Sequence, residues 1–308
     1  MNFWTLANLF TVDTWDYGIL EMDARELVDS FHLGHWQHRG VVRPPRRHKR
    51  SYIADTLPWG GDRILAEDYD YASGLGKIVA MDPEGRVENT LFEGPDLHFS
   101  FPFSFTCGGR DYLMVEHRDP ASITRLYELA QDSAGRAVAV NPRVLELGVD
   151  HLVDPVIFEQ GDGIYLLGSV GASATRQELC IWHARSLSGP WTRLSDVDAV
   201  DAWGRMAGPI LNLDGDLYRL GQDHTRCYGN ALTLTRILNL SPSGYEEVPV
   251  GRLTSPFPEF PHGCHTAAFM DENQLVIDVG RRILPFGVGG GMADWMRITR
   301  KRLERLHG

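Results

Sequence analysis

The sequence predicts an all-β protein folded as a five-bladed β-propeller, with the N-terminal segment completing the last blade. One unit recurs along the chain: a polar or small residue, often followed by proline, then an apolar strand, a Gly/Asp/Asn turn and a second apolar strand. The units repeat about every 50 residues, which is typical of propeller blades with several strands each. The 32 glycines and 17 prolines fit a chain with many turns.

The five units open with similar stretches. They are YIADTLPW at 52–59, FSFPFSF at 99–105, LVDPVIF at 152–158, MAGPIL at 206–211 and CHTAAF at 264–269. We therefore expect inner strands to begin near residues 53, 100, 154, 208 and 265. A two-sheet sandwich is the alternative architecture, but its strands would not recur with this order and period.

The outer strands follow each unit. Third strands are predicted at 77–82, 124–130, 178–186 and 230–238, and fourth strands in GRVENTLFE, PRVLEL, GPWTRLS and GYEEVPV. The fifth unit lacks outer strands, whereas the segment 15–31 precedes the first unit. We expect this segment to complete the fifth blade and close the ring, which removes an exposed sheet edge. Part of 21–31 also fits helical spacing, and the tail 292–306 fits either a helix or a final strand.

Charge and cysteine usage exclude several classes of function. The net charge of −11 argues against nucleic acid or an anionic membrane as the main partner. The basic run at 43–50 is short and interrupted by proline, so we interpret it as a loop. The four cysteines are far apart and form no Cys-x-x-Cys pair. Without a signal-peptide pattern or a long apolar stretch, we expect one cytoplasmic domain over 1–308 with no membrane span.

Residues at the starts of the inner strands should converge at one end of the central channel. Asp55, Asp154 and His265 occupy equivalent places in three units, so we predict that they face one pocket. An aspartate before proline also commonly fixes a turn, which is the structural alternative for Asp154. His98, Ser100 and Arg205 lie just before equivalent positions in the other two units, and we expect them to contact a substrate.

Other ionisable residues gather near the ends of the second strands. The stretch QDHTRCYG at 222–229 brings together Asp223, His224, Arg226 and Tyr228, and Arg226 is suited to a carboxylate or phosphate. A polar turn is the alternative interpretation of this stretch. Glu116 occupies the equivalent place in the second unit and Glu67 in the first. A buried glutamate near other carboxylates has a raised pKa and can act as an acid.

Two of these motifs resemble known five-bladed glycoside hydrolases that act on arabinan, xylan and fructan. SLSGPWTRL at 186–194 is similar to a turn frequent in their third blade. The resemblance implies that Asp55 is the general base and that Asp154 tunes the acid and orients the sugar. The same resemblance places the general acid, a glutamate, at position 207, where this chain has alanine. Without that proton donor, ordinary two-carboxylate hydrolysis lacks its acid.

A closer resemblance covers nearly the whole chain. The stretches VDPVIFEQGDGIYLL, GQDHTRCYGNALTLTRI and HGCHTAAF are similar to the propeller domain at the N-terminus of plant glucosamine inositolphosphorylceramide transferases. This resemblance implies a five-bladed fold and a link to glycoconjugates.

We therefore expect an enzyme that performs acid–base chemistry on a sugar, a glycoconjugate or another polyhydroxylated metabolite. The predicted catalytic residues are Asp55, Asp154, Glu116 and His224. The predicted substrate-binding residues are His98, Ser100, Arg205, Asp223, Arg226, Tyr228 and His265. Elimination, isomerisation or cyclisation in a biosynthetic pathway is one alternative, and a non-catalytic glycan-binding module is another. No cofactor is expected, although His224, His262 and His265 leave a central metal cation as an alternative.

Overall fold

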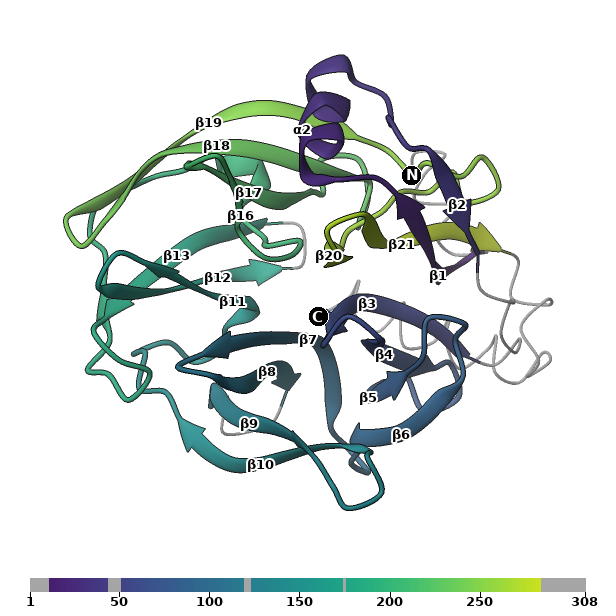
Figure 1. Cartoon of the computed structure of the whole chain (residues 1–308), viewed down its shortest axis with the longest axis horizontal. Helices are drawn as coiled ribbons and strands as arrows, with labels where there is room; N and C mark the ends of the chain where they lie inside the picture. Colours follow the sequence, from purple (N-terminus) through teal and green to yellow (C-terminus); the bar gives the residue numbers. More distant parts are fainter. Residues whose placement is uncertain (1–10, 44–50, 119–122, 174–175, 284–308) are drawn as a thin grey trace.

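The computed structural model of the chain describes residues 11–43, 51–118, 123–173 and 176–283. Within these residues the chain forms five sheets arranged around a central axis (Figure 1). The predicted five-bladed propeller is therefore confirmed. Most of the basic run at 43–50 and the tail at 292–306 lie outside the described residues.

The first three blades each consist of four consecutive strands. Blade 1 contains β3 (Ser51–Trp59), β4 (Arg63–Asp70), β5 (Leu75–Met81) and β6 (Val87–Phe92). Blade 2 contains β7 (His98–Cys107), β8 (Arg110–Arg118), β9 (Arg125–Gln131) and β10 (Ala137–Val144). Blade 3 contains β11 (Val153–Gln160), β12 (Gly163–Ser173), β13 (Arg176–Ala184) and β14 (Thr192–Arg193).

The fourth blade has a short inner strand and an additional outer one. It contains β16 (Leu211–Leu213), β17 (Asp216–Asp223), β18 (Ala231–Ser241), β19 (Gly244–Leu253) and, parallel to β19, β15 (Val197–Asp198). A 3₁₀ helix, η1 (Asp201–Trp203), precedes its inner strand.

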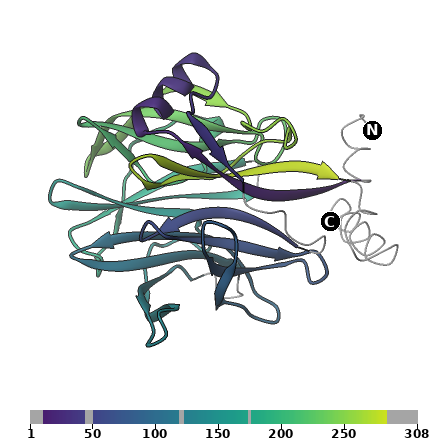
Figure 2. The same cartoon turned by 45° about the vertical axis from the view of Figure 1, so that its right-hand side comes forward.

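The N-terminal segment completes the fifth blade, as the sequence predicted. The inner strands β20 (Ala267–Asp271) and β21 (Gln274–Ile283) are followed outward by β1 (Val12–Glu21) and β2 (Gly40–Val42). Figures 1 and 2 both show β1 beside β21, with which it pairs along its full length. Chain segments from the two ends of the described sequence thus share one sheet, and this closes the ring.

The helical alternative for part of 21–31 is also correct. Helix α2 (Ala24–Leu33) follows β1 directly, and the Asp23 and Glu26 side chains form a capping box at its N-terminus. Gly34 ends it in the left-handed conformation. Leu27 and Phe31 are buried in the core cluster shared by the fourth and fifth blades. Within the described residues, neither α2 nor η1 is long and apolar enough to cross a bilayer.

Two outer strands differ from the predicted ones. In blade 2 the fourth strand begins at Ala137, earlier than PRVLEL, because a bulge between Val140 and Arg143 accommodates Asn141 and Pro142 within the strand. In blade 3 the predicted stretch GPWTRLS contributes only the two residues of β14. Both differences lie at the rim and leave the central strands unchanged.

Candidate functional site

The centre of the ring is built from a bulge repeated in the inner strands. Asp55, Phe101 and Asp154 have left-handed backbone conformations, with φ of 50°, 46° and 49°. Each lies in a register shift of its inner strand. Such a bulge turns a backbone N–H and a side chain out of the ladder. Aspartate tolerates this conformation better than most residues, which suits two of the three positions.

Carboxylates from one blade accept the backbone N–H groups of these bulges in the next blade. Asp55 donates its N–H to Asp278 of blade 5 (3.1 Å). Phe101 donates to Asp55 (3.1 Å), and Asp154 donates to Glu116 (3.4 Å). The acidic side chains therefore join neighbouring blades, in addition to any chemistry that they perform.

At the centre of the junction between blades 4 and 5, a backbone carbonyl oxygen takes the place of the carboxylate. Ala267 N–H donates directly to the carbonyl oxygen of Ala207 (2.8 Å). A Cβ at Gly208 would lie only 2.1 Å from the Ala267 carbonyl oxygen, so glycine is required for this close approach. Ala207 itself is fully buried. The position at which the glycosidase resemblance places an acid thus forms a tight contact between two blades.

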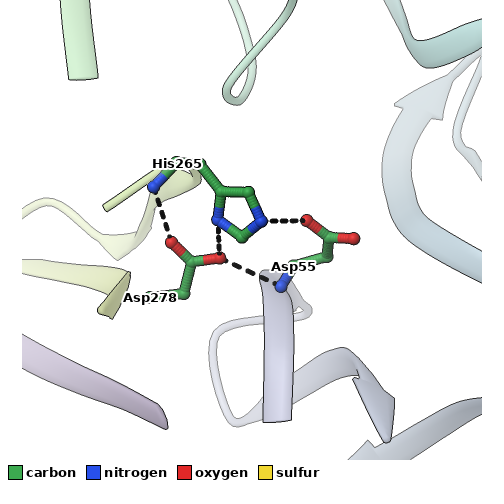
Figure 3. A group of neighbouring side chains, drawn as sticks. All are labelled: Asp55, His265 and Asp278. Atoms are coloured by element: carbon green, nitrogen blue, oxygen red, sulfur yellow. Dashed lines mark hydrogen bonds and ion pairs between the residues drawn. The ribbon is translucent and has the colours of Figure 1, made fainter. Parts of the chain in front are cut away.

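Asp55, His265 and Asp278 form the first polar group at the centre (Figure 3). The Nδ1 atom of His265 lies 2.5 Å from Asp278, and its Nε2 atom lies 3.6 Å from Asp55. Asp278 also accepts the backbone N–H groups of His265 and Thr266. Burial disfavours the charged imidazole, but Asp278 and Asp55 outweigh this and raise the pKa of His265. Burial likewise opposes the charge of Asp278, yet His265 and the backbone donors lower its pKa.

The same three residues could supply ligands to a cation. Their donor atoms all lie within 4.8 Å of one another. A metal would require His265 to give up its proton, whereas here the ring is paired with both carboxylates. A central cation therefore stays an alternative to the ion pair.

Aromatic rings hold His265 in place. Trp15 of β1 stacks on it with centroids 4.1 Å apart and an interplanar angle of 22°. Tyr228 meets it edge-on at 5.3 Å. The N-terminal strand therefore contributes directly to the central group as well as closing the ring.

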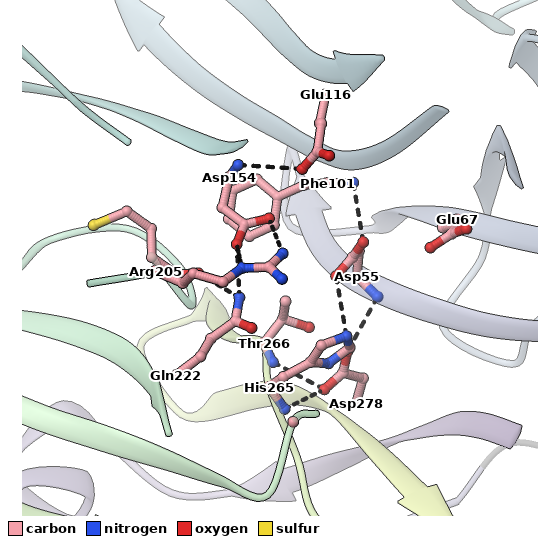
Figure 4. Close-up of polar contacts among 12 residues, drawn as sticks. Asp55, Glu67, Phe101, Glu116, Asp154, Arg205, Gln222, His265, Thr266 and Asp278 are labelled. Atoms are coloured by element: carbon pink, nitrogen blue, oxygen red, sulfur yellow. Dashed lines mark hydrogen bonds and ion pairs between the residues drawn. The ribbon is translucent and has the colours of Figure 1, made fainter. Parts of the chain in front are cut away.

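Asp154, Arg205 and Gln222 form the second polar group (Figure 4). Arg205 donates to both oxygens of Asp154, at 2.6 and 3.0 Å, and Gln222 donates to the same carboxylate at 2.9 Å. Burial raises the pKa of Asp154 even though Arg205 opposes the shift. The guanidinium of Arg205 also lies over the ring of Tyr228, 5.3 Å from its centroid. Asp154 is thus both a bulge residue and half of a buried ion pair.

His224 is neutral in this environment. Gly229 donates its N–H to Nδ1 (3.0 Å), so the ring proton is on Nε2, which lies 2.9 Å from the Gln222 side-chain oxygen. Burial, followed by the charge of Arg205, lowers the pKa of His224 to about 2. Its hydrogen bonds orient Gln222 and do not favour the predicted role of proton donor.

Two glutamates each face a histidine from the following blade. Glu67 Oε1 lies 3.7 Å from His98 Nε2, and Glu116 Oε1 lies 3.3 Å from His151 Nε2. Both glutamates are buried, whereas both histidines are partly exposed. Each histidine is therefore near a buried carboxyl group and also partly open to solvent.

The remaining predicted residues differ in how they relate to the centre. Ser100 is buried opposite Glu116 in the strand register. Asp223 accepts from Thr225 and Asn230 and pairs with Arg252, so its contacts stabilise the loop after β17. Arg226 is exposed, and its predicted role in substrate binding stays a prediction.

Asp55 and Asp278, the two carboxylates beside His265, differ in the charge state that their surroundings favour. Burial raises the pKa of Asp55 to about 7; His265 opposes this shift, and the charges of Asp154 and Asp278 add to it. Asp278, in contrast, is kept ionised. Carboxyl groups whose pKa values are pushed apart mark sites able to give and take protons near neutral pH.

Sequence reasoning missed Asp278, Gln222 and Trp15. Asp278 and Gln222 occupy second strands whose polar residues point inward among apolar neighbours, in DENQLVIDVG and LDGDLYRLGQ. A polar residue inside an apolar strand was the available signal, because buried polar groups are normally hydrogen-bonded. Trp15 carried no such signal, since its contact with His265 depends on closure of the ring.

Comparison with known families gives one match to more than half of the chain. The model described as "Glucosamine inositolphosphorylceramide transferase 1, N-terminal" matches residues 90–256. Glucosamine inositolphosphorylceramide transferase 1 of Arabidopsis thaliana is 32% identical over 194 residues, covering 59% of this chain and 23% of that protein. The Oryza sativa subsp. japonica protein of the same name is 28% identical over 163 residues, covering 50% and 21%. The matched region is thus less than a quarter of the length of these relatives.

Solved structures with a similar fold are glycoside hydrolases. An exo-β-1,3-galactanase from Clostridium thermocellum has a TM-score of 0.52 at 13% identity, covering 70% of this chain and 53% of that one. A β-xylosidase/α-arabinofuranosidase from a compost microbial metagenome has a TM-score of 0.50 at 12% identity, covering 79% and 93%. At these identities the similarity shows the fold alone.

Proposed function

Because the chain belongs to the family of N-terminal domains of glucosamine inositolphosphorylceramide transferases, we propose that its propeller performs acid–base chemistry on a sugar of a glycoconjugate. The reaction takes place at the centre of the ring, around Asp55, Asp154 and His265. Glucosamine-bearing headgroups are the first substrates to consider, since the relatives carry glucosamine and inositol phosphate in their names.

One observation carries the proposal. Asp55 combines a central position with a pKa of about 7, next to the ion-paired His265 and Asp278. A general base is most effective when its pKa is near the working pH. In this proposal Asp55 takes a proton from the attacking hydroxyl or water, and His265 favours the ionised form of Asp55 that can accept this proton.

Asp154 has an orienting role in the same proposal. Arg205 and Gln222 hold its carboxylate on three sides, which fixes its position and keeps it from rotating. A carboxylate fixed in this way can accept a hydrogen bond from a sugar hydroxyl through its remaining lone pairs. Among the partly exposed aromatic residues, Tyr228 lies against Arg205, and Tyr52 and Tyr69 stack on each other.

The test is a product search with a defined panel of sugars. Wild-type protein is incubated with a glucosaminyl inositol phosphate and with nitrophenyl glucosaminides, and products are identified by mass spectrometry. Turnover that is lost in Asp154→Asn and kept in Glu84→Gln, an exposed surface glutamate, supports the proposal. Equal turnover in all three proteins would place the chemistry elsewhere.

A non-catalytic glycan-binding module is the second candidate. The hydrogen bonds that carboxylates make to neighbouring blades favour it, because they give Asp55, Glu116 and Asp278 a structural role. Binding of the same sugars by calorimetry without any product would establish this function instead.

A further inference from the structure

Glu67 and Glu116 occupy equivalent positions in blades 1 and 2. Glu67 pairs in register with Ala54, which precedes the bulge of its inner strand, and Glu116 pairs with Ser100, which precedes the next bulge. Each lies beside a histidine of the following blade, His98 or His151. The two glutamates differ in their hydrogen bonds, and this difference has a structural cause.

Glu116 accepts the N–H of the bulge in the next blade, whereas Glu67 does not. The equivalent donor for Glu67 would be the N–H of Phe101, but this group donates to Asp55 instead. Glu67 Oε1 is consequently buried without a hydrogen-bond partner among the described residues. In Figure 4, Glu67 lies on the opposite side of Asp55 from Asp154.

The chain leaves room for the Glu67 carboxyl group at Gly76. A Cβ on Gly76 would lie 2.2 Å from Glu67 Oε1. The N–H of Gly76 donates to Nδ1 of His98 (2.9 Å), so the neutral His98 ring carries its proton on Nε2, the atom nearest Glu67. One side of His98 is thus fixed, and the other faces the carboxyl group.

The surroundings of Glu67 favour its neutral form. The residue is 6% exposed, and the basic group that faces its carboxyl oxygen is the partly exposed His98, 3.7 Å away. Burial, followed by the charges of Asp55 and Glu116, raises its pKa well above the ordinary value. Its surroundings thus favour the carboxylic acid form of Glu67, close to Asp55, whose pKa is about 7.

We propose that Glu67 is the proton donor of the central site, supplying the acid that is missing at Ala207, and that His98 restores its proton from solvent. The inference rests on the proposed sugar chemistry. As the bond between the sugar carbon and the leaving oxygen breaks, Glu67 gives its proton to that oxygen and becomes a carboxylate. Asp55 accepts the proton of the attacking water or hydroxyl. Exchange with solvent through His98 reprotonates Glu67, and Asp55 releases its proton, so the cycle is balanced.

Infrared spectroscopy tests the protonation state without a substrate. At about pH 8.5, more than a unit above the pKa of about 7 for Asp55, wild-type protein should retain the carbonyl band of a protonated carboxylic acid. Glu67→Gln should remove this band, whereas Glu84→Gln and Asp55→Asn should keep it. Absence of the band in wild type, or its persistence in Glu67→Gln, would overturn the inference.

Leaving-group dependence tests the catalytic role. With methyl glucosaminide, Glu67→Gln should lower kcat/KM by about 10²–10⁴-fold, the usual contribution of a general acid. With dinitrophenyl glucosaminide, whose leaving group needs no protonation, the loss should be less than about tenfold. Equal losses on both sugars, or none, would overturn the donor role while the proposed function stands. Lack of wild-type turnover on the whole sugar panel would overturn the proposed function and the donor role with it.

Discussion

Asp55 combines three properties at one position. Its backbone is left-handed, one carboxylate oxygen accepts the Phe101 N–H, and the other faces His265. Asparagine can keep the backbone conformation and the bond from Phe101, but it cannot ionise. Asp55→Asn therefore isolates the effect of the charge from the effect of shape.

The charge of Asp55 should give stability a particular pH dependence. Its folded pKa is raised from 3.8 to about 7, so the folded state binds more protons than the unfolded state between these values. Its contribution to the free energy of unfolding is largest below pH 4 and is lost as the pH rises to 7. As the pH rises through this window, Asp55→Asn should become progressively more stable than wild type. Above about pH 7 the difference in unfolding free energy should stay constant. Urea unfolding at several pH values measures this, and a difference that shrinks as pH rises would contradict it.

Arg205 should be more important for stability than surface arginines. Arg205→Met leaves the Asp154 carboxylate buried without its bidentate partner, and breaking such a pair typically costs about 3–5 kcal/mol. Arg236→Met is the matched control, since Arg236 pairs with Asp216 on the exposed surface and such pairs contribute about 0–1 kcal/mol. Equal losses of unfolding free energy in the two variants would show that the central pair is not the stabilising element.

At the scale of elements, the N-terminal strand links ring closure to the site. Trp15 packs against Gly229 and Gly280 as well as His265, and a Cβ on either glycine would lie less than 3 Å from its ring. Trp15→Ala should cost about 3–5 kcal/mol, as expected for a large buried side chain. Val42→Ala, on the exposed outer strand of the same sheet, should change stability by less than about 0.5 kcal/mol. Chemical denaturation of both variants measures these losses of unfolding free energy. A mild effect of Trp15→Ala would show that the contact between Trp15 and His265 does not contribute to closure of the ring.

The sequence could predict the inner strands because four of the five units combine an apolar run with a proline, and the fifth, with Thr266 in that place, keeps the period. It could also predict that Asp55 and Asp154 take equivalent positions, since both occupy the left-handed bulge of their inner strands, whereas His265 precedes β20. It could not assign the hydrogen bonds between blades, since these depend on which of two neighbouring carboxylates lies close enough to accept a bulge N–H. That competition leaves Glu67 without a backbone donor and satisfies Glu116, and it gives His224 a positioning role through Gln222.

At the scale of the whole molecule, the fold is shared with glycoside hydrolases, and the resemblance noted in the sequence would place their acid at Ala207. Ala207 contacts blade 5 through its carbonyl oxygen, and its side chain is fully buried. We therefore predict little or no activity on aryl arabinosides and xylosides. Release of nitrophenol from these compounds is the measurement, and robust hydrolysis by the wild-type protein would show that the alanine is irrelevant.

The pH dependence of turnover on a glucosaminyl inositol phosphate tests the central claim most directly. If Asp55 is the base, kcat/KM should fall on the acidic side with an apparent pKa near 7, the value of its carboxyl group. Asp55→Asn, which keeps the bulge and the bond from Phe101, should lower kcat/KM by about 10²–10⁴-fold and remove this limb. Wild-type turnover in Asp55→Asn, with the same acidic limb, would contradict the assignment of the centre of the propeller as an acid–base site.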